Sequence, residues 1–327
     1  MAVEAGAATS APLVIHPGFV KTATSTLQKH VFARHPGIHF LGLPAPLPEL
    51  EWAIRHICQA DSVDYDPARL CGVIGESLAS APTGAVPLIS YENLALHESK
   101  DKGLVADRLA ALFPAARILF TIRRQEDLVL SWYLTKLRVR IKRKAYIPFE
   151  EWYWLETREP WNSILDDLRY GRTIGHYAAR FGAERIMVLP FELLVHEPHV
   201  FAERAAGFIG VDSRLFSEFL AGKRENSAMS RRYLFFWKHF SHLLPRRLVR
   251  KWARRMPMHK GARAQIDMPQ RIRDHIRAMV AEDNAVLAAR FGVDLAVWGY
   301  SLTQPSPVLP IAGGDLAALH LPAERSL

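Results

Sequence analysis

Short apolar runs alternate with longer helical patterns through the first two thirds of the chain. The four runs occupy residues 13–16, 86–90, 117–122 and 185–189. Apolar residues recur at helical spacing in the segments at 25–34, 105–113, 126–137, 164–181 and 199–209. Buried strands that alternate with helices indicate βαβ units. The sequence therefore predicts an α/β protein with three layers, α/β/α, around a central parallel sheet.

The carboxyl ends of the predicted strands are where functional residues are expected, because ligands of open α/β sheets bind outside these ends. The loops in question follow His16, Ser90, Ile122 and Leu189. Pro87 lacks an amide donor, so we expect it at the start of its strand or at the sheet edge.

Length and composition are those of an ordinary globular protein. The 327 residues, 49% of them hydrophobic, supply one sizeable core with extensions. We expect one domain over residues 12–303, with flexible ends at 1–11 and 304–327, where the composition is rich in alanine, proline or glycine.

The balance of charges favours an acidic partner. The formal net charge of +9 suits a polyphosphorylated nucleotide, an anionic glycan, anionic lipid or nucleic acid. Two cysteines without a CxxC pair indicate neither a disulfide framework nor a zinc site. The start of the chain lacks a basic signal region, and no run of about 20 apolar residues occurs. We expect a cytoplasmic protein.

The loop after the first run carries a lysine and several hydroxyls at the start of a helix. These residues are Lys21, Thr22, Thr24, Ser25 and Thr26. Free amides and the helix dipole make such a position an anion site. The alternative is that a hydroxyl merely caps the helix and the lysine is solvated.

A Walker A loop does not fit this segment. Only Phe19 and Val20 separate Gly18 from Lys21, and no glycine precedes the lysine. The sequence also lacks a convincing apolar strand that ends in a Mg²⁺-binding aspartate. ATP and GTP chemistry are therefore disfavoured.

The third run ends in Arg123, and Ser131 follows eight residues later. An arginine at a strand end can donate two hydrogen bonds to a phosphate, and a hydroxyl two helical turns further on can donate a third. The alternative is a solvated strand end and an ordinary helix residue.

These two segments resemble the donor site of PAPS-dependent sulfotransferases, where PAPS is 3′-phosphoadenosine 5′-phosphosulfate. Residues 21–26 resemble the 5′-phosphosulfate loop, usually Lys-[Thr/Ser]-Gly-[Thr/Ser]-[Thr/Ser]. Ala23 stands in the glycine position, and its methyl group demands ordinary backbone angles or a slight rearrangement. The run 118–123 with Ser131 resembles the 3′-phosphate site.

The resemblance extends over about residues 12–300, with bacterial, carbohydrate-sulfotransferase-like features. Residues 188–194 look like the family's strand followed by Tyr/Phe-Glu-x-Leu, and residues 292–300 look like its closing segment. It implies a P-loop-like sulfotransferase fold, PAPS as donor, PAP as product and no required metal. It also implies that helices within 231–303 form part of the acceptor cleft.

Sulfuryl transfer resembles phosphoryl transfer, an in-line displacement catalysed by positioning and electrostatics. The resemblance implies that Lys21 contacts the sulfuryl group or the bridging oxygen. Glu92 is the first candidate for the base and His97 the second, and the alternative for both is a capping or solvated residue. We expect a structural role for Glu192.

Three further groups leave alternatives open. Lys223 and Arg224 resemble a late loop that covers PAP, or are solvated charges. The basic aromatic segment 231–255 lies on an anionic membrane or holds an acidic acceptor, or packs its aromatics in the core. A second aromatic cluster forms an acceptor wall or belongs to the core. Its members are Phe149, Trp152, Tyr153, Trp154 and Trp161.

The function expected from the sequence is transfer of a sulfuryl group from PAPS to a hydroxyl, less readily an amine, of a carbohydrate or glycolipid. One rival is a P-loop-type kinase, which predicts ATP turnover with Mg²⁺. The other is a non-catalytic basic protein that binds membrane or nucleic acid, with salt-sensitive binding that survives Lys21→Ala. No recognised nucleic-acid module is present, so no nucleic acid is expected. The sequence leaves the oligomeric state open.

Overall fold

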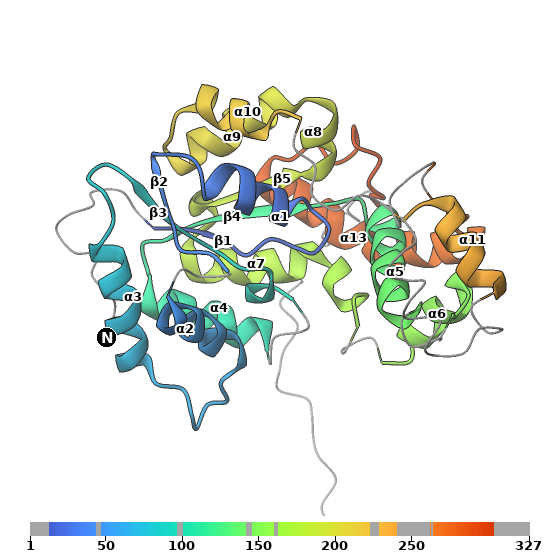
Figure 1. The fold of residues 1–327 in the computed structure, drawn as a ribbon, viewed down its shortest axis with the longest axis horizontal. Helices are drawn as coiled ribbons and strands as arrows, with labels where there is room; N and C mark the ends of the chain where they lie inside the picture. The colour runs from blue at the N-terminus through green and yellow to red at the C-terminus, as the bar shows by residue number, and fades with distance from the viewer. Residues whose placement is uncertain are drawn as a thin grey trace, which may run out of the picture.

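The structure is a computed structural model that describes residues 13–43, 47–96, 101–141, 146–159, 163–222, 229–240, 262 and 264–303. Its centre is a sheet of five parallel strands (Figure 1). In spatial order these are β2 (Ile38–Phe40), β3 (Val86–Ser90), β1 (Val14–His16), β4 (Arg117–Ile122) and β5 (Ile186–Pro190).

The four strands expected from the sequence are confirmed, and β2 is an addition to them. Pro87 is the second residue of β3, so its expected place at the strand start is confirmed. The alternative, a place at the sheet edge, is wrong, because β3 lies between β2 and β1. Pro87 pairs with His39 of the short outer strand β2.

Alternate residues of the strands face two separate hydrophobic clusters. Ile15 and Ile118 point into one cluster, which includes side chains of α2 (Pro48–Gln59), α3 (Pro67–Ala79), α4 (Lys102–Leu112) and α7 (Tyr170–Phe181). Their neighbours Val14 and Leu119 point into the other, with the π-helical turn η1 (Leu27–Phe32), α9 (Pro198–Ile209) and α10 (Ser213–Leu220). The predicted three-layer α/β/α fold is confirmed, with α9 and α10 on one side of the sheet and α2, α3 and α4 on the other in Figure 1.

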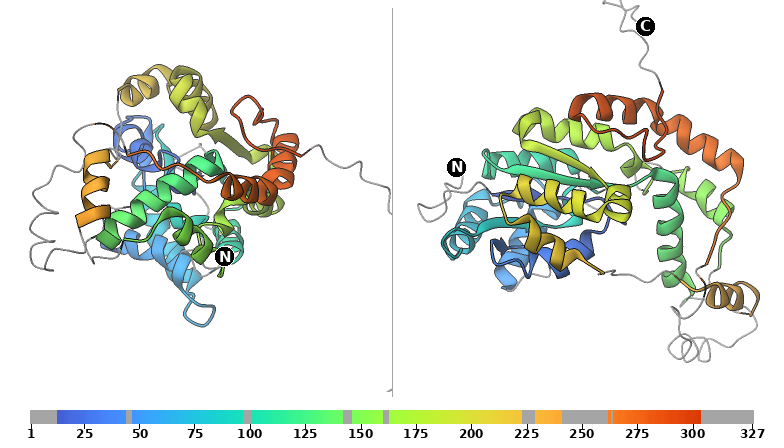
Figure 2. Two further views of the ribbon diagram at one scale, coloured as in Figure 1. Left: turned by 90° about the vertical axis from the view of Figure 1, so that its right-hand side faces the viewer. Right: turned by 90° about the horizontal axis from the view of Figure 1, so that it is seen from above.

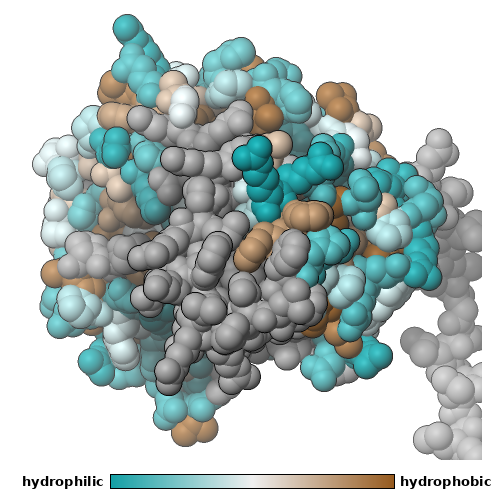
Figure 3. Space-filling model, turned by 45° about the vertical axis from the view of Figure 1, so that its right-hand side comes forward, coloured by the Kyte–Doolittle hydropathy of each residue, from teal (hydrophilic) through white to brown (hydrophobic). Residues whose placement is uncertain are grey.

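A group of helices lies beyond the carboxyl end of β4, next to the sheet rather than on its faces (Figures 1 and 2). It comprises α5 (Gln125–Ile141), α6 (Phe149–Glu156) and α11 (Arg231–Phe240). The long helix α13 (Gln270–Phe291) packs against α7. On the face shown in Figure 3, the coloured surface mixes hydrophilic residues with small groups of apolar ones.

The aromatic residues of α6 belong to the core. Phe149, Trp152 and Tyr153 are buried, which agrees with the core alternative rather than an acceptor wall. Trp154 is half-buried against the same core, and Trp161 lies outside the described residues.

The basic aromatic segment is described only over α11. Tyr233 is buried there, whereas Phe235 is 58% exposed. The helix therefore packs one aromatic side chain in the core and exposes another. Residues 241–255 lie outside the described residues, and contact of 231–255 with a membrane or acceptor stays a prediction. Among the described helices, none is long and apolar enough to cross a bilayer.

Candidate functional site

The loop that follows β1 occupies the point where the strand order of the sheet reverses. β1 is flanked by β3 on one side and by β4 on the other, although both come later in the chain. Ligands of parallel α/β sheets bind in the crevice at such a point. The backbone amide of Tyr91 donates to the carbonyl of His16 at 3.3 Å, so the loops after β1 and β3 are joined directly.

Two residues of this loop adopt the left-handed conformation without being glycine. Lys21 has φ 65° and Ala23 has φ 71°. For an L-residue this conformation costs roughly 1–2 kcal/mol, and such strain is concentrated at ligand clamps and active sites. The expectation of ordinary backbone angles at Ala23 is therefore wrong: the loop keeps the shape that suits a glycine, and the methyl group is accommodated within it.

The glycine at the start of the loop is required by its surroundings. Gly18 has φ +56°, and a Cβ atom at this position would lie 2.8 Å from Oγ1 of Thr24 and 3.0 Å from the His16 ring. A side chain at this position would therefore collide with the first turn of α1 (Thr24–Thr26).

Two of the predicted donor-binding threonines use their hydroxyls to hold the loop together. Thr22 Oγ1 donates to the carbonyl of Phe19 at 2.6 Å and lies 2.8 Å from Oγ1 of Thr121 on β4. Thr24 Oγ1 donates to the same carbonyl at 3.3 Å. Both side chains are buried. An anion at this loop would therefore meet Lys21 and the first backbone amides of α1, because a helix leaves its first N–H groups without an acceptor of its own. The amide of Thr26 already donates to the carbonyl of Ala23 at 2.9 Å.

The remaining members of the predicted loop, Ser25 and Thr26, lie in the first turn of the helix. Ser25 is half-buried and Thr26 is buried. Helix α1 continues directly into η1, so this turn opens a helical segment that runs to Phe32.

Arg123, at the end of β4, reaches across to the lysine loop. Its Nη1 donates to the carbonyl of Lys21 at 3.1 Å, and its guanidinium lies 4.7 Å from the centre of the Phe191 ring. The Nε atom is buried without a hydrogen-bond partner in the described structure. Burial lowers the pKa of Arg123 from its ordinary value. A desolvated cation would be stabilised by an anionic ligand.

The structure brings Glu92 to the same edge of the sheet. Glu92 opens the 3₁₀ turn η2 (Glu92–Leu94), directly after β3, and is half-buried. Ser131 lies in the second turn of α5 and is also half-buried. The other predicted site residues, His97, Lys223 and Arg224, lie outside the described residues, so their roles stay predictions.

Glu192 has the structural contacts expected for it. Its Oε1 accepts from the backbone amide of Arg124 at 3.0 Å, and its Oε2 accepts from the Tyr300 hydroxyl at 2.9 Å. Burial, reinforced by the Glu192 carboxylate, raises the pKa of Tyr300. The carboxylate, which belongs to α8 (Phe191–His196), thus joins the end of β4 to the closing segment of the chain.

A cavity of about 470 Å³ opens beside Arg123, which is within the size range of small-molecule sites. Phe191, His196 and Trp298 contribute rings to its lining, and the His196 and Trp298 rings are stacked. Val195 and Val297, both largely exposed, add apolar surface at its rim. Sequence reasoning did not single out His196, because only the fold brings it next to Trp298.

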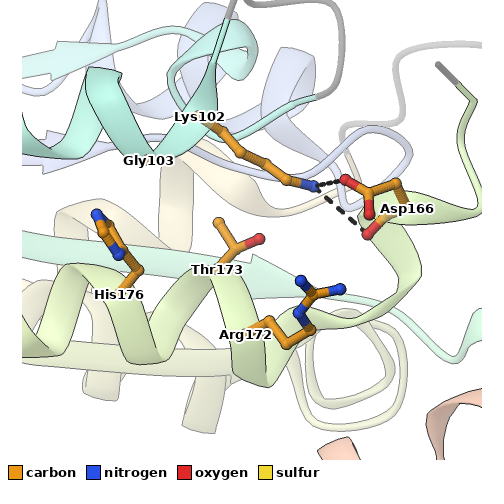
Figure 4. Close-up of a pocket in the computed structure, with 6 residues that line it drawn as sticks. All are labelled: Lys102, Gly103, Asp166, Arg172, Thr173 and His176. Carbon is orange, nitrogen blue, oxygen red and sulfur yellow. Dashed lines mark hydrogen bonds and ion pairs between the residues drawn. The ribbon is translucent and has the colours of Figure 1, made fainter. Parts of the chain in front are cut away.

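A second cavity, of about 170 Å³, lies between α4 and α7. Figure 4 shows Lys102 reaching from α4 to Asp166, while Arg172, Thr173 and His176 project from α7. Lys102 also pairs with the buried carboxylate of Asp167 at 3.2 Å. Asp166 and Asp167 belong to the 3₁₀ turn η4 (Asp166–Leu168) that precedes α7. The sequence analysis assigned none of these residues a role in binding or catalysis.

Among the described residues, no group of three or more His, Cys, Asp or Glu side chains is arranged to hold a metal ion.

Comparison with known proteins places the fold. No family model matches the chain, and no curated protein matches it. A sulfotransferase from Alicyclobacillus acidocaldarius matches with a TM-score of 0.55 and 17% identity, over 89% of this chain and 99% of that one. The sulfotransferase domain from the curacin biosynthetic pathway matches with 0.42 and 12%, over 90% and 99%. The sulfotransferase domain of a Synechococcus olefin synthase matches with 0.37 and 15%, over 75% and 93%. The first of these likenesses gives this chain the sulfotransferase fold.

Proposed function

We propose that this chain is a sulfotransferase that moves a sulfuryl group from PAPS to a hydroxyl, less readily an amine, of an acceptor. The observation that carries the proposal is the hydrogen bond from Arg123 to the carbonyl of Lys21. It joins Arg123, at the end of β4, to the backbone of the loop that carries Lys21, at the end of β1, and basic residues at two adjacent strand ends suit a donor with phosphate at both its 3′ and 5′ ends. The fold agrees with this chemistry.

The residues fit such a donor. Arg123 is desolvated and keeps a buried Nε without a partner in the described structure, so an anionic oxygen would satisfy a group that is otherwise unpaired. The strained loop at Lys21 and Ala23 presents the start of a helix to the second anionic end. Ser131 is the proposed further donor to the 3′-phosphate.

PAPS supplies an activated sulfuryl group, whose sulfur is bonded to the bridging phosphate oxygen. In the proposed step, the acceptor oxygen forms a bond to sulfur while the bond from sulfur to the bridging oxygen breaks, and PAP leaves with the electron pair. Lys21 stabilises the negative charge on the departing oxygen. Glu92 takes the proton from the acceptor hydroxyl, since it follows the strand next to β1. The scheme requires no metal.

A carbohydrate or glycolipid is the proposed acceptor. The support is chemical: the net charge of +9 favours an acceptor with anionic groups. Residues 231–255 are proposed to contact this acceptor or an anionic membrane, and α11 is the part of that segment that the structure describes.

The donor site is tested by calorimetric titration of PAP into the wild type, Lys21→Ala and Arg123→Ala, with ATP as the comparison ligand. Lys29→Ala and Arg180→Ala are matched controls, because both side chains are exposed and Arg180 pairs with Asp107 on α4. We expect tight binding of PAP, weaker binding in the two site variants, unchanged binding in the controls and much poorer binding of ATP.

Activity is tested with PAPS and a glycan library. We expect Lys21→Ala to lower the transfer rate on the order of 10²- to 10³-fold, and Glu92→Gln to lower the rate while PAP affinity stays unchanged. If the folded wild type binds no PAP, or binds ATP more tightly than PAP, the proposed function is wrong.

A further inference from the structure

A chain of buried hydrogen bonds runs beneath the lysine loop and joins three strand ends. Ser90 Oγ at the end of β3 lies 2.8 Å from Nδ1 of His16 at the end of β1. Nε2 of His16 lies 3.4 Å from Oγ1 of Thr121 on β4, which lies 2.8 Å from Oγ1 of Thr22 in the loop. Gln28, in η1, contacts Ser90 Oγ at 3.0 Å.

The direction of this chain is fixed at its loop end. The carbonyl of Phe19 can only accept, so the single proton of the Thr22 hydroxyl points to it, at 2.6 Å. Thr22 Oγ1 must then accept from Thr121. The Thr121 hydroxyl has donated its proton, so it accepts from Nε2 of His16, which therefore carries hydrogen.

The other end is compatible with the same tautomer. Nε2 of Gln28 lies 3.3 Å from the Ser90 carbonyl, which can only accept, so this atom is the amide nitrogen. It therefore also donates to Ser90 Oγ, and the Ser90 proton goes to Nδ1 of His16. The loop end requires hydrogen on Nε2, and the contacts of Ser90 accommodate a neutral imidazole of this tautomer.

The surroundings of His16 agree with a neutral ring. The side chain is fully buried, with the ring of Phe32 packed edge-on at 5.4 Å between ring centres. Burial lowers the pKa of His16 to about 3. A second proton would place N–H groups on both sides of the ring, so the Ser90 proton could no longer point to Nδ1 and the buried ring would carry a charge.

We propose that His16 is a positioning residue that holds Thr22, and with it the left-handed turn at Lys21 and Ala23, in the shape that binds the donor. The proposal rests on the proposed function of the lysine loop. His16 touches neither substrate nor reacting atoms; it acts through Thr121. Because Lys21 and Ala23 occupy a strained conformation, the loop relaxes unless the surrounding structure holds it.

Two substitutions interrupt the chain without touching the loop. Thr121→Val removes the hydroxyl that bonds to Thr22, and Ser90→Ala removes the one that bonds to His16. The matched control is Ser77→Ala, a buried serine whose hydroxyl donates to Val73 within α3. We expect the dissociation constant for PAP to rise on the order of tenfold in the first two variants, which is about one hydrogen bond's worth of free energy, and to stay unchanged in Ser77→Ala.

The positioning role predicts a coupling that a general loss of stability would not produce. In the Thr121→Val background the loop is misplaced, so Lys21→Ala should raise the PAP dissociation constant by a smaller factor than it does in the wild type. Urea unfolding of each variant shows that the protein is folded during the titrations.

The state of the ring is measured in the wild type without any ligand. Nitrogen chemical shifts of selectively labelled histidine, with His16→Gln to assign the signal, report which nitrogen carries hydrogen. We expect the neutral form protonated on Nε2 from pH 7.5 down to pH 5.5. A ring protonated on Nδ1, or charged at pH 5.5, would overturn the hydrogen-bond chain.

The outcomes separate the two claims. If the wild type binds PAP but Thr121→Val and Ser90→Ala bind it equally well, or if Lys21→Ala costs the same factor in both backgrounds, the positioning role is wrong and the proposed function stands. If the wild type binds no PAP, the proposed function fails and the positioning role falls with it, while the nitrogen shifts still decide the hydrogen-bond chain.

Discussion

Arg123 donates a hydrogen bond from Nη1 to the carbonyl oxygen of Lys21 at 3.1 Å, although 102 residues separate them in the chain. The contact consumes one of the five N–H donors of the guanidinium and leaves its Nε buried without a partner in the described structure. Arg123 therefore holds the lysine loop through Nη1, and its Nε is a hydrogen-bond donor that a ligand could satisfy.

Replacing Arg123 by lysine should weaken donor binding although the charge is kept. A lysine ammonium is a point charge without the planar fork, so it cannot bond to the Lys21 carbonyl and to a phosphate in the same geometry. We expect the PAP dissociation constant to rise on the order of 10- to 100-fold, as for loss of a hydrogen bond to a charged group. Titration calorimetry measures it, with Arg180→Lys as the exposed control. An unchanged constant in Arg123→Lys would contradict the role of the fork.

The left-handed conformation of Ala23 predicts a stabilising substitution. Ala23→Gly removes the steric cost of φ 71°, and we expect the free energy of unfolding to increase by about 0.5–1 kcal/mol after the larger chain entropy of glycine is subtracted. Ala33→Gly is the matched comparison, because Ala33 has φ −75° and should lose about 0.5–1 kcal/mol. Urea unfolding of both variants measures the difference. Destabilisation of Ala23→Gly would show that the methyl group packs favourably in the loop.

Burial of neutral His16 makes stability depend on pH in one direction. The pKa is about 3 in the folded protein against 6.5 ordinarily, so between these pH values the unfolded chain binds a proton that the folded protein does not. The free energy of unfolding should therefore fall on acidification below pH 6.5, by about 2 kcal/mol at pH 5 from this group alone. The measurement is urea unfolding from pH 7.5 to 5 of the wild type and His16→Gln. Equal pH dependence in the two proteins would refute it.

Because the Glu192 carboxylate is buried, we expect two tyrosine variants to differ in how much free energy of unfolding they lose. Tyr300→Phe removes the hydroxyl that donates to Oε2, so a buried charged oxygen loses its partner, and we expect a loss of about 1.5–3 kcal/mol. Tyr133→Phe removes a hydroxyl that donates to the neutral carbonyl of Ile147, and the expected loss is about 0.5–1.5 kcal/mol. Thermal and urea unfolding rank the two, and the reverse order would contradict the electrostatic explanation.

The strands that the sequence predicts are those composed mainly of apolar residues. β3, β4 and β5 carry consecutive aliphatic residues, because both their faces are buried between helical layers. β2 has His39 at its centre and spans only three residues. Its strand conformation follows from pairing with β3 rather than from its own pattern, so a local reading of the sequence does not find it.

The sequence predicts the site residues that lie directly after a strand. Lys21, Glu92 and Arg123 each follow an apolar run, and parallel strands bring such positions to one edge. The contacts among them depend on strand order, which the sequence does not state: Arg123 meets Lys21 because β4 lies beside β1, although β2 and β3 come between them in the chain. The roles of Ser90 and Thr121 beneath the loop depend on the same arrangement.

An alanine held at φ 71° has a consequence for protein engineering. The segment from Gly18 to Thr24 is held by bonds among its own residues and by one from Thr121 of β4, and His16 before it contacts side chains of two neighbouring strands. The conformational preferences of its own residues alone oppose this shape. A synthetic peptide of this sequence would not adopt the loop conformation. A graft of these residues alone onto another sheet would transfer the sequence but not the loop conformation. The transplantable unit includes the serine and the threonine on the adjoining strands.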